Sequence, residues 1–413
     1  MPSALGQNFF RHEYGRLVAI LSRRIGARHL DLVEDAVQLA LAAAVEIWPR
    51  SGAPENPSAW LFRVAQNHLV GELRRTARHA ELAARQETEA EPATARDVQA
   101  YLAGDVRDDS LRMLFACCEA AIPVESQVVL ALKVLCGFDV REICERLFIS
   151  EANAYKRLAR AKSRLREVEP DVDGLSLAQL ASRLPAVQTV LYVLFTEGYL
   201  SSHAEGAIRR ELCDEAIRLA EELAQHPVSA LPDTFALLAL MHLHRARLPA
   251  RQDGSGGLLL LEEQDRALWD ADEVAAGLAW LARSATGTVF SRYHAEAGIA
   301  AEHCLAPTFA ETRWERIVEC YALLEQVAPS ALHTLNRALA LAEWQGPAQA
   351  LKLLEGLAPP SWLVGSYLWA AVFADLHRRA GNPAEAERHR GTALATAPSP
   401  AVREALERRL TSR

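Results

Sequence analysis

The sequence is short of the residues and patterns that mark fibrous, low-complexity and membrane-spanning proteins. Its 21 glycines and 19 prolines in 413 residues are too few for a collagen-like or low-complexity chain. Its longest uncharged stretch, 356–374, is broken by Pro359 and Pro360, and what remains is shorter than the roughly 20 residues of a bilayer-spanning helix. Alanine and leucine dominate the apolar residues, at the expense of valine, isoleucine and threonine. The sequence therefore predicts a helical protein without a membrane segment.

The sequence also has no cysteine pattern of a metal site or a disulfide framework, and no pattern of an export signal. The seven cysteines are odd in number, show no Cys-x-x-Cys spacing, and mostly lie inside apolar helical patterns. The first 16 residues have no basic start followed by an apolar core, and Arg11, Glu13 and Arg16 interrupt them. We expect a reduced, cytoplasmic protein.

Length and composition indicate an all-α protein of two or three domains. Half of the residues are apolar and 24% are charged, as in ordinary globular proteins. Between positions 81 and 109 the chain has eight acids, three arginines and few bulky apolar residues, which indicates a linker. We therefore expect a helical domain at 1–80, an acidic linker at 81–110, a second helical domain at 111–170 and a larger helical domain at 175–413.

A weak repeat is present near the end of the chain. Gly346 and Gly381 each separate two apolar helical runs and lie 35 residues apart, with Pro359 and Pro398 after the second runs. That spacing is close to the 34-residue period of tetratricopeptide helix pairs. The pattern favours a tetratricopeptide-like array, with a plain bundle of helical hairpins as the alternative.

Segment 138–167 has the form of a helix-turn-helix, in which Ser150 is the N-cap of the second helix. That second helix carries six cations and no acid between positions 153 and 166, although the net charge of the chain is −8. At 100° per residue the polar side chains form one stripe, and Ala154, Leu158, Ala161 and Leu165 form another that can pack. The free stripe suits a DNA major groove, and its candidate contacts are Asn153, Lys156, Arg157, Arg160 and Arg164. A solvated basic face is the alternative.

A second cationic stripe lies in segment 59–78, where Arg63, Asn67, Arg74 and Arg78 share one face of a helix. The opposite face carries Leu61, Val64, Ala65 and Leu69. The negative total charge thus conceals two basic surfaces, both in the first 170 residues.

With these motifs the chain resembles the extracytoplasmic-function sigma factors of bacterial RNA polymerase. The resemblance rests on 34–38 (EDAVQ), 60–67 (WLFRVAQN), 73–75 (LRR), 142–147 (EICERL) and 155–161 (YKRLARA). The remainder resembles a subgroup with a long tetratricopeptide-like extension, through 194–199 (LFTEGY), 212–219 (LCDEAIRL) and 259–269 (LLLEEQDRALW).

The resemblance implies that the first domain binds core RNA polymerase and opens the minus-ten promoter element, while the second reads the minus-thirty-five element. It assigns polymerase binding to Asp35 and Gln38. It also assigns six residues to the helix that melts the promoter: Trp60, Arg63, Asn67, Arg74, Arg75 and Arg78. Trp60 has an equal alternative as a buried anchor of its helix. Two departures from the family pattern are Leu39, where an acid is usual, and Gly71, where an aspartate is usual.

The resemblance also implies regulation in cis by the C-terminal domain. The many apolar helix faces of this domain favour packing against the sigma blocks, and hence a required, activating role, over a mobile inhibitory lid. Nothing in the sequence indicates catalysis, and we expect no enzyme activity, cofactor or metal. His242 and His244, two residues apart, do not share a helix face, and the acidic run 262–270 favours a solvated helix end over a cation site. The alternative function is a helix-turn-helix regulator with a ligand-binding or enzymatic C-terminal domain.

Overall fold

The computed structural model describes residues 4–81, 106–168, 175–201, 208–254 and 256–411, and in these ranges the chain folds into helices without a strand. The all-α prediction is confirmed. Contacts divide the chain into two compact units, Met1–Val190 and Leu191–Arg413. The division falls inside helix α9 (Leu177–Tyr199), later than the predicted boundary near residue 175. Among the described helices, none is both long and apolar enough to cross a membrane.

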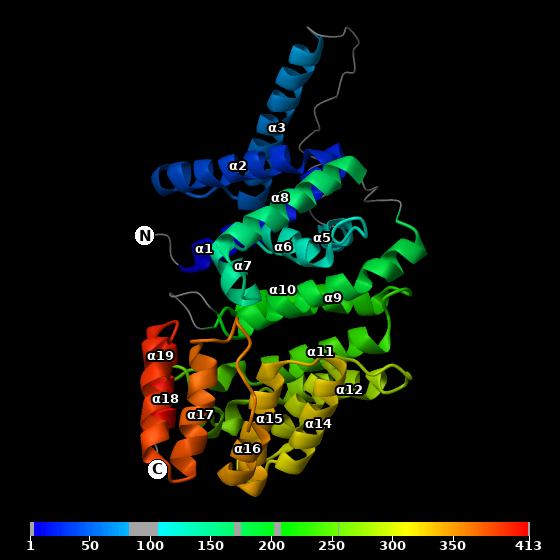
Figure 1. Cartoon of the computed structure of the whole chain (residues 1–413). Helices are drawn as coiled ribbons and strands as arrows, with labels where there is room; N and C mark the ends of the chain where they lie inside the picture. The colour runs from blue at the N-terminus through cyan, green and yellow to red at the C-terminus, as the bar shows by residue number, and fades with distance from the viewer. Residues whose placement is uncertain (1–3, 82–105, 169–174, 202–207, 255, 412–413) are drawn as a thin grey trace. The chain divides into compact units, whose positions relative to one another are not determined.

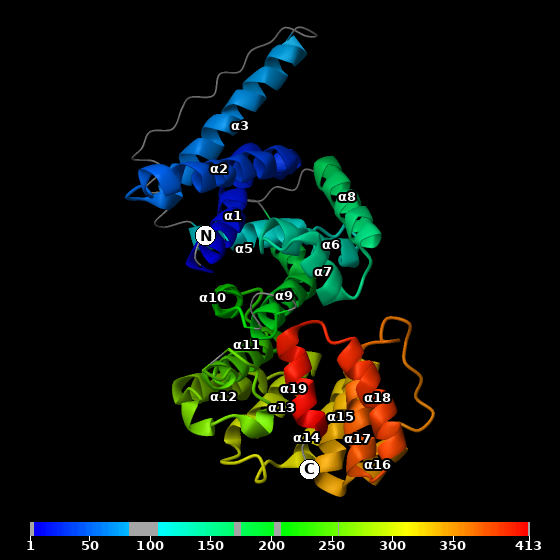
Figure 2. The same ribbon diagram turned by 90° about the vertical axis from the view of Figure 1, so that its left-hand side faces the viewer.

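The first unit consists of two groups of helices. The helices of its first part are α1 (Ala4–Ile25), α2 (Leu30–Ser51) and α3 (Pro57–Glu81), and those of its second part are α5 (Val106–Cys117), α6 (Val124–Val134), α7 (Val140–Leu147) and α8 (Glu151–Val168). We call residues 4–81 the first block and residues 106–168 the second block. Figures 1 and 2 both show α3 projecting away from α2 as a long helix.

The predicted linker is too long at its C-terminal end. Helix α5 begins at Val106, and within it Asp109 is buried and forms an ion pair of 2.5 Å with Arg23 of α1. An acid that composition assigns to a solvated segment is thus a partner in the core. The rest of the predicted linker, 82–105, lies outside the described residues.

The helix-turn-helix prediction is confirmed by α7 and α8. Asp139 caps α7 in a capping box with Glu142, and Phe148 turns the chain in the left-handed region at φ 53°. The Ser150 hydroxyl then accepts a hydrogen bond from the N–H of Asn153, as expected of an N-cap. Helix α8 packs on α6 and α7 through the predicted apolar stripe, in which Leu165 is fully buried.

The second unit is a series of helix pairs. After α9 its helices are α10 (Arg210–Gln225), α11 (Pro232–Arg245), α12 (Ala271–Ser284), α13 (Arg292–Leu305), α14 (Trp314–Val327), α15 (Ala331–Gln345), α16 (Pro347–Leu353), α17 (Tyr367–Arg379), α18 (Pro383–Ala395) and α19 (Pro400–Thr411). Gly346 and Gly381 form the turns of the pairs α15–α16 and α17–α18, at φ 91° and 75°. These pairs stand side by side in Figure 1, as the repeat predicts.

The acidic run 262–270 is not the solvated helix end that the sequence favoured. It forms two 3-10 turns, Leu261–Glu263 and Arg266–Leu268. Glu262 lies 2.8 Å from Arg409 and Glu263 lies 3.1 Å from Arg408, so two acids of the run hold α19 in place.

We predict that Gly15→Ala destabilises the first unit, because an added Cβ would lie 1.9 Å from the Leu135 carbonyl oxygen in the second block. Overpacking of this kind costs about 1–3 kcal/mol. The control Gly71→Ala adds the same methyl group where nothing lies within 4 Å, and should stabilise α3 by about 0.5–1 kcal/mol. Chemical unfolding midpoints and amide exchange in α1 and α6 measure both effects. Equal midpoints would contradict the close approach.

Candidate nucleic-acid interface

The outer face of α8 is the first cationic surface. Lys156, Arg160 and Arg164 are exposed, and Asn153 and Arg157 are half-buried beside them. Arg164 pairs with Glu167 at 2.6 Å. Among the described residues, Lys156, Arg157 and Arg160 have no ion-pair partner. The predicted stripe is therefore present and largely uncompensated, and its role in DNA binding stays a prediction.

The second cationic surface lies along α3. Arg63, Asn67 and Arg74 are exposed on it, while Leu61, Ala65 and Leu69 are buried on the opposite side. Three further candidates lie on this helix. Arg75 is exposed and pairs with Glu72 at 2.6 Å, whereas Trp60 is half-buried. The side chain of Arg78 lies outside the part of the chain that the structure describes.

The Trp60 ring lies edge-on to Trp48, with the centroids 5.6 Å apart, and Trp48 stacks on Phe10. These rings join the beginning of α3 to α1 and α2. Their packing favours the alternative in which Trp60 anchors its helix.

The candidate polymerase contacts lie together on α2. Asp35 and Gln38 are exposed and line a groove between α2 and α3 whose wall includes Leu39. Leu39 is 49% exposed, and further along the helix Val45 and Ile47 are exposed as well. Leu39, an exposed apolar side chain beside Asp35 and Gln38, is suited to a contact with another protein.

The opposite flank of α8 contacts α2 through a buried carboxylate. Glu34 is 4% exposed, and it accepts hydrogen bonds from the Tyr14 hydroxyl at 2.8 Å and from Lys162 at 2.5 Å. Lys162 also lies 2.8 Å from Asp31, which in turn pairs with Arg166 at 2.5 Å. Although burial favours the neutral amine, Glu34 and Asp31 outweigh it and raise the pKa of Lys162. This contact joins the two blocks.

A second contact between the blocks involves the capping residue Glu142. The Arg11 guanidinium donates to both of its carboxylate oxygens at 3.0 and 3.1 Å, and it lies over the Phe138 ring. Neither this pair nor the Lys162 pairs could be found by sequence reasoning, because partners more than 120 residues apart leave no local pattern. The only sequence signal is that Glu34 and Glu142 fall within the motifs of the family resemblance.

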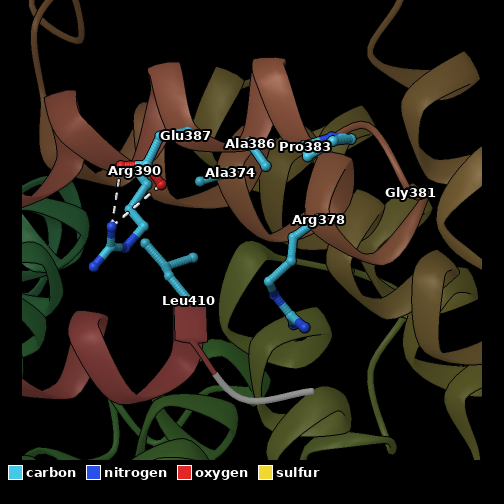
Figure 3. Close-up of a pocket in the computed structure, with 8 residues that line it drawn as sticks. All are labelled: Ala374, Arg378, Gly381, Pro383, Ala386, Glu387, Arg390 and Leu410. Atoms are coloured by element: carbon cyan, nitrogen blue, oxygen red, sulfur yellow. Dashed lines mark hydrogen bonds and ion pairs between the residues drawn. The ribbon is translucent and has the colours of Figure 1, made fainter.

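A small hollow of about 240 Å³ lies between α17, α18 and α19, and Figure 3 shows its lining. The lining residues are Ala374, Arg378, Gly381, Pro383, Ala386, Glu387, Arg390 and Leu410. Arg390 pairs with Glu387 at 3.1 Å and Arg378 with Asp375 at 2.7 Å. Because both guanidinium groups already have partners on their own helices, the hollow offers little free charge to a ligand.

The paired histidines His242 and His244, and His303 near them, lie among structural partners, with His242 buried and the other two half-buried. His242 lies 2.8 Å from Glu273. Burial, helped by Arg247, lowers the pKa of His244 well below its usual value and that of His303 to about 3. Neutral, enclosed imidazoles of this kind support packing.

Comparison with known families decides the identity of the two blocks. Residues 9–79 match sigma-70 region 2, and residues 112–165 match sigma-70 region 4. The chain is an extracytoplasmic-function-like sigma factor. Its long C-terminal extension includes a match, at residues 183–285, to a family of unknown function. The α3 helix thus belongs to region 2, and the helix-turn-helix α7–α8 belongs to region 4.

One curated protein is similar to this sigma factor over nearly its whole length. An uncharacterized protein of Rhizobium meliloti (strain 1021) is 36% identical over 383 residues, which cover 91% of the sigma factor and 89% of that protein. No solved structure matches the chain. Sigma-70 regions 2 and 4 imply that core RNA polymerase and promoter DNA are the partners of this transcription factor.

We predict that Lys162→Met destabilises the first unit by about 1–3 kcal/mol, because the buried Glu34 carboxylate keeps only Tyr14 as a donor. Adding Glu34→Gln should recover part of the loss, since the buried charge is then gone. The control Arg164→Met removes only the exposed pair with Glu167 and should cost less than about 0.5 kcal/mol. Unfolding midpoints test the series, and a Lys162→Met midpoint equal to that of the control would refute it.

Proposed function

We propose that this sigma factor binds core RNA polymerase through α2, reads a promoter through α8 and α3, and is regulated in cis by its C-terminal unit. The observation that carries the proposal is the pair of cationic helix faces, one in each sigma region. A polyanion is a suitable partner for such faces, and cations concentrated on two helices of a chain with a net charge of −8 favour this reading over a solvated basic face.

Helix α8 is proposed to enter the major groove. Arg157 and Arg160 are the side chains best placed to reach base edges, with Asn153 at the beginning of the helix. Lys156, at one edge of the stripe, and Arg164, near the end of the helix, are then phosphate contacts. On α3, Arg63, Arg74 and Arg75 are proposed to hold the phosphates of the opened strand.

Run-off transcription with purified core polymerase tests the proposal. We expect Arg157→Ala and Arg160→Ala to weaken promoter binding by about 1–3 kcal/mol each, with a smaller effect on nonspecific duplex. The control Arg316→Ala removes an exposed arginine of the second unit and should leave binding unchanged. Equal losses on all DNA sequences would make both residues phosphate contacts. Duplex binding without promoter-specific initiation would instead support the alternative helix-turn-helix regulator.

The C-terminal unit is proposed to brace the sigma blocks and to be required for transcription. Its acidic segment 262–273 is the obvious candidate for a lid on the cationic helices, but those acids have internal uses. Glu262 and Glu263 pair with α19, while Asp265 and Asp270 cap the helices that follow them. Glu273 pairs with Arg245 and His242. Acids engaged in this way favour a bracing role over an electrostatic lid.

Truncation distinguishes these roles. We expect a chain ending after Ser201 to fold and bind duplex DNA but to lose most run-off activity. This end point keeps Arg183, which is buried and donates to Glu119 and the Phe115 carbonyl of α5. A second chain, which ends after Gly174, lacks Arg183. Any further loss of activity in this chain measures how much the first unit depends on that contact in order to fold. If the chain ending after Ser201 transcribes more than the full-length protein, and its circular dichroism shows that its helices are retained, the C-terminal unit is an inhibitor.

A further inference from the structure

Three metal-ligating side chains come together at the turn of the α17–α18 pair. His377 lies in the last turn of α17, and Glu385 and His389 lie four residues apart on α18, hence on one face of that helix. One donor atom from each of the three lies within 4.8 Å of the others. His389 Nε2 and Glu385 Oε2 are 3.9 Å apart. Two helices therefore direct imidazole and carboxylate donors to one point.

The positions of these donors are set by backbone and packing. The turn is closed by Gly381 at φ 75° and by a hydrogen bond of 2.9 Å from the Asn382 N–H to the His377 carbonyl. The imidazoles of His377 and His389 are parallel to within 2°, with centroids 5.9 Å apart. The Phe373 ring stacks on His389 at 5.3 Å and restricts its rotation.

A cationic nitrogen already occupies part of this point. Arg388 Nη2 lies 3.2 Å from His389 Nε2, and the same nitrogen donates to Glu385. Because a guanidinium can only donate, His389 Nε2 accepts in this contact, so the nitrogen that faces Arg388 and Glu385 offers a lone pair.

We propose that His377, Glu385 and His389 bind a divalent transition-metal ion, for which Zn²⁺ is the probe, with water in the fourth position. Two imidazoles and a carboxylate are a ligand set of open zinc sites, and imidazole selects zinc, copper and nickel over magnesium and calcium. The ion takes the place of the Arg388 guanidinium, whose side chain is 66% exposed and can turn into solvent. A bound ion links α17 to α18.

The competing explanation is that the two histidines and Phe373 are an aromatic packing cluster. It accounts for the parallel rings, and the ion pair with Arg388 accounts for Glu385, but it predicts no metal binding and therefore no effect of Arg388 on it. The two explanations therefore differ in the outcome of one substitution outside the ligand set.

The experiment uses the full-length chain, freed of metal with a chelator. Co²⁺ is titrated by its visible absorption and displaced with Zn²⁺, whose affinity is measured by calorimetry. We expect His377→Ala and His389→Ala each to weaken binding by about 100-fold or more, since losing a ligand costs more than losing a second-shell partner. Arg388→Ala should tighten binding roughly fivefold by removing the competing cation. The control His226→Ala removes an exposed histidine of the same unit and should change nothing.

Amide hydrogen exchange gives a second readout that does not depend on the affinity. Zn²⁺ should slow exchange in the turn between α17 and α18 in the wild-type protein and in Arg388→Ala, but not in the histidine variants. The proposal is wrong if the histidine variants bind as the wild type does, or if Arg388→Ala binds no tighter. Arg388→Ala alters an exposed side chain, so its result does not depend on how well the histidine variants fold.

Discussion

The buried carboxylate of Glu34 is the constraint on which the arrangement of the two sigma regions depends. A charged group removed from water needs donors around it, and an uncompensated carboxylate costs several kcal/mol. Tyr14 of α1 and Lys162 of α8 supply those donors to α2. Burial, and after it the charge of Glu34, raises the pKa of Tyr14, so its hydroxyl stays protonated and donates. One group in region 2 thereby requires a helix of region 4 beside it.

This requirement divides α8 into two sides with different tasks. Lys162 and Arg166 pair with acids of α2, whereas Lys156, Arg157 and Arg160 form no ion pair among the described residues. Docking and the proposed groove contacts therefore do not compete for the same side chains. Asp31 and Glu34 lie about one helical turn before Asp35 and Gln38, so a partner bound at those positions comes close to the ion pairs that hold α8.

The sequence was a good guide where a local pattern carries the physics. The 3.6-residue periodicity predicted both faces of α8 and of α3, and the capping residue Ser150 predicted where α8 begins. It failed where partners are distant in sequence. In the sequence, Asp109 does not differ from the other acids of its segment, and only the fold shows its ion pair with Arg23. Lys162 likewise does not differ from the other five cations of α8, and only the fold shows its ion pair with Glu34 of α2.

The histidine cluster shows the same limit at shorter range. His377 and His389 were not among the candidates because the turn between them hides their proximity. The spacing of Glu385 and His389, four residues apart on one helix, was the signal that could have raised the question. A third donor on a neighbouring helix is visible only when the turn geometry at Gly381 is known.

Charge is used differently in the two units of this sigma factor. In the C-terminal unit, Glu262, Glu263 and Glu273 pair with arginines, while Asp265 and Asp270 cap the helices that follow them, so these five acids stabilise that unit. On α8, cations at neighbouring positions of one face repel each other, which weakens the helix. Phosphates placed along that face remove the repulsion, so part of the binding free energy for DNA comes from relieving a cost already present in the free protein.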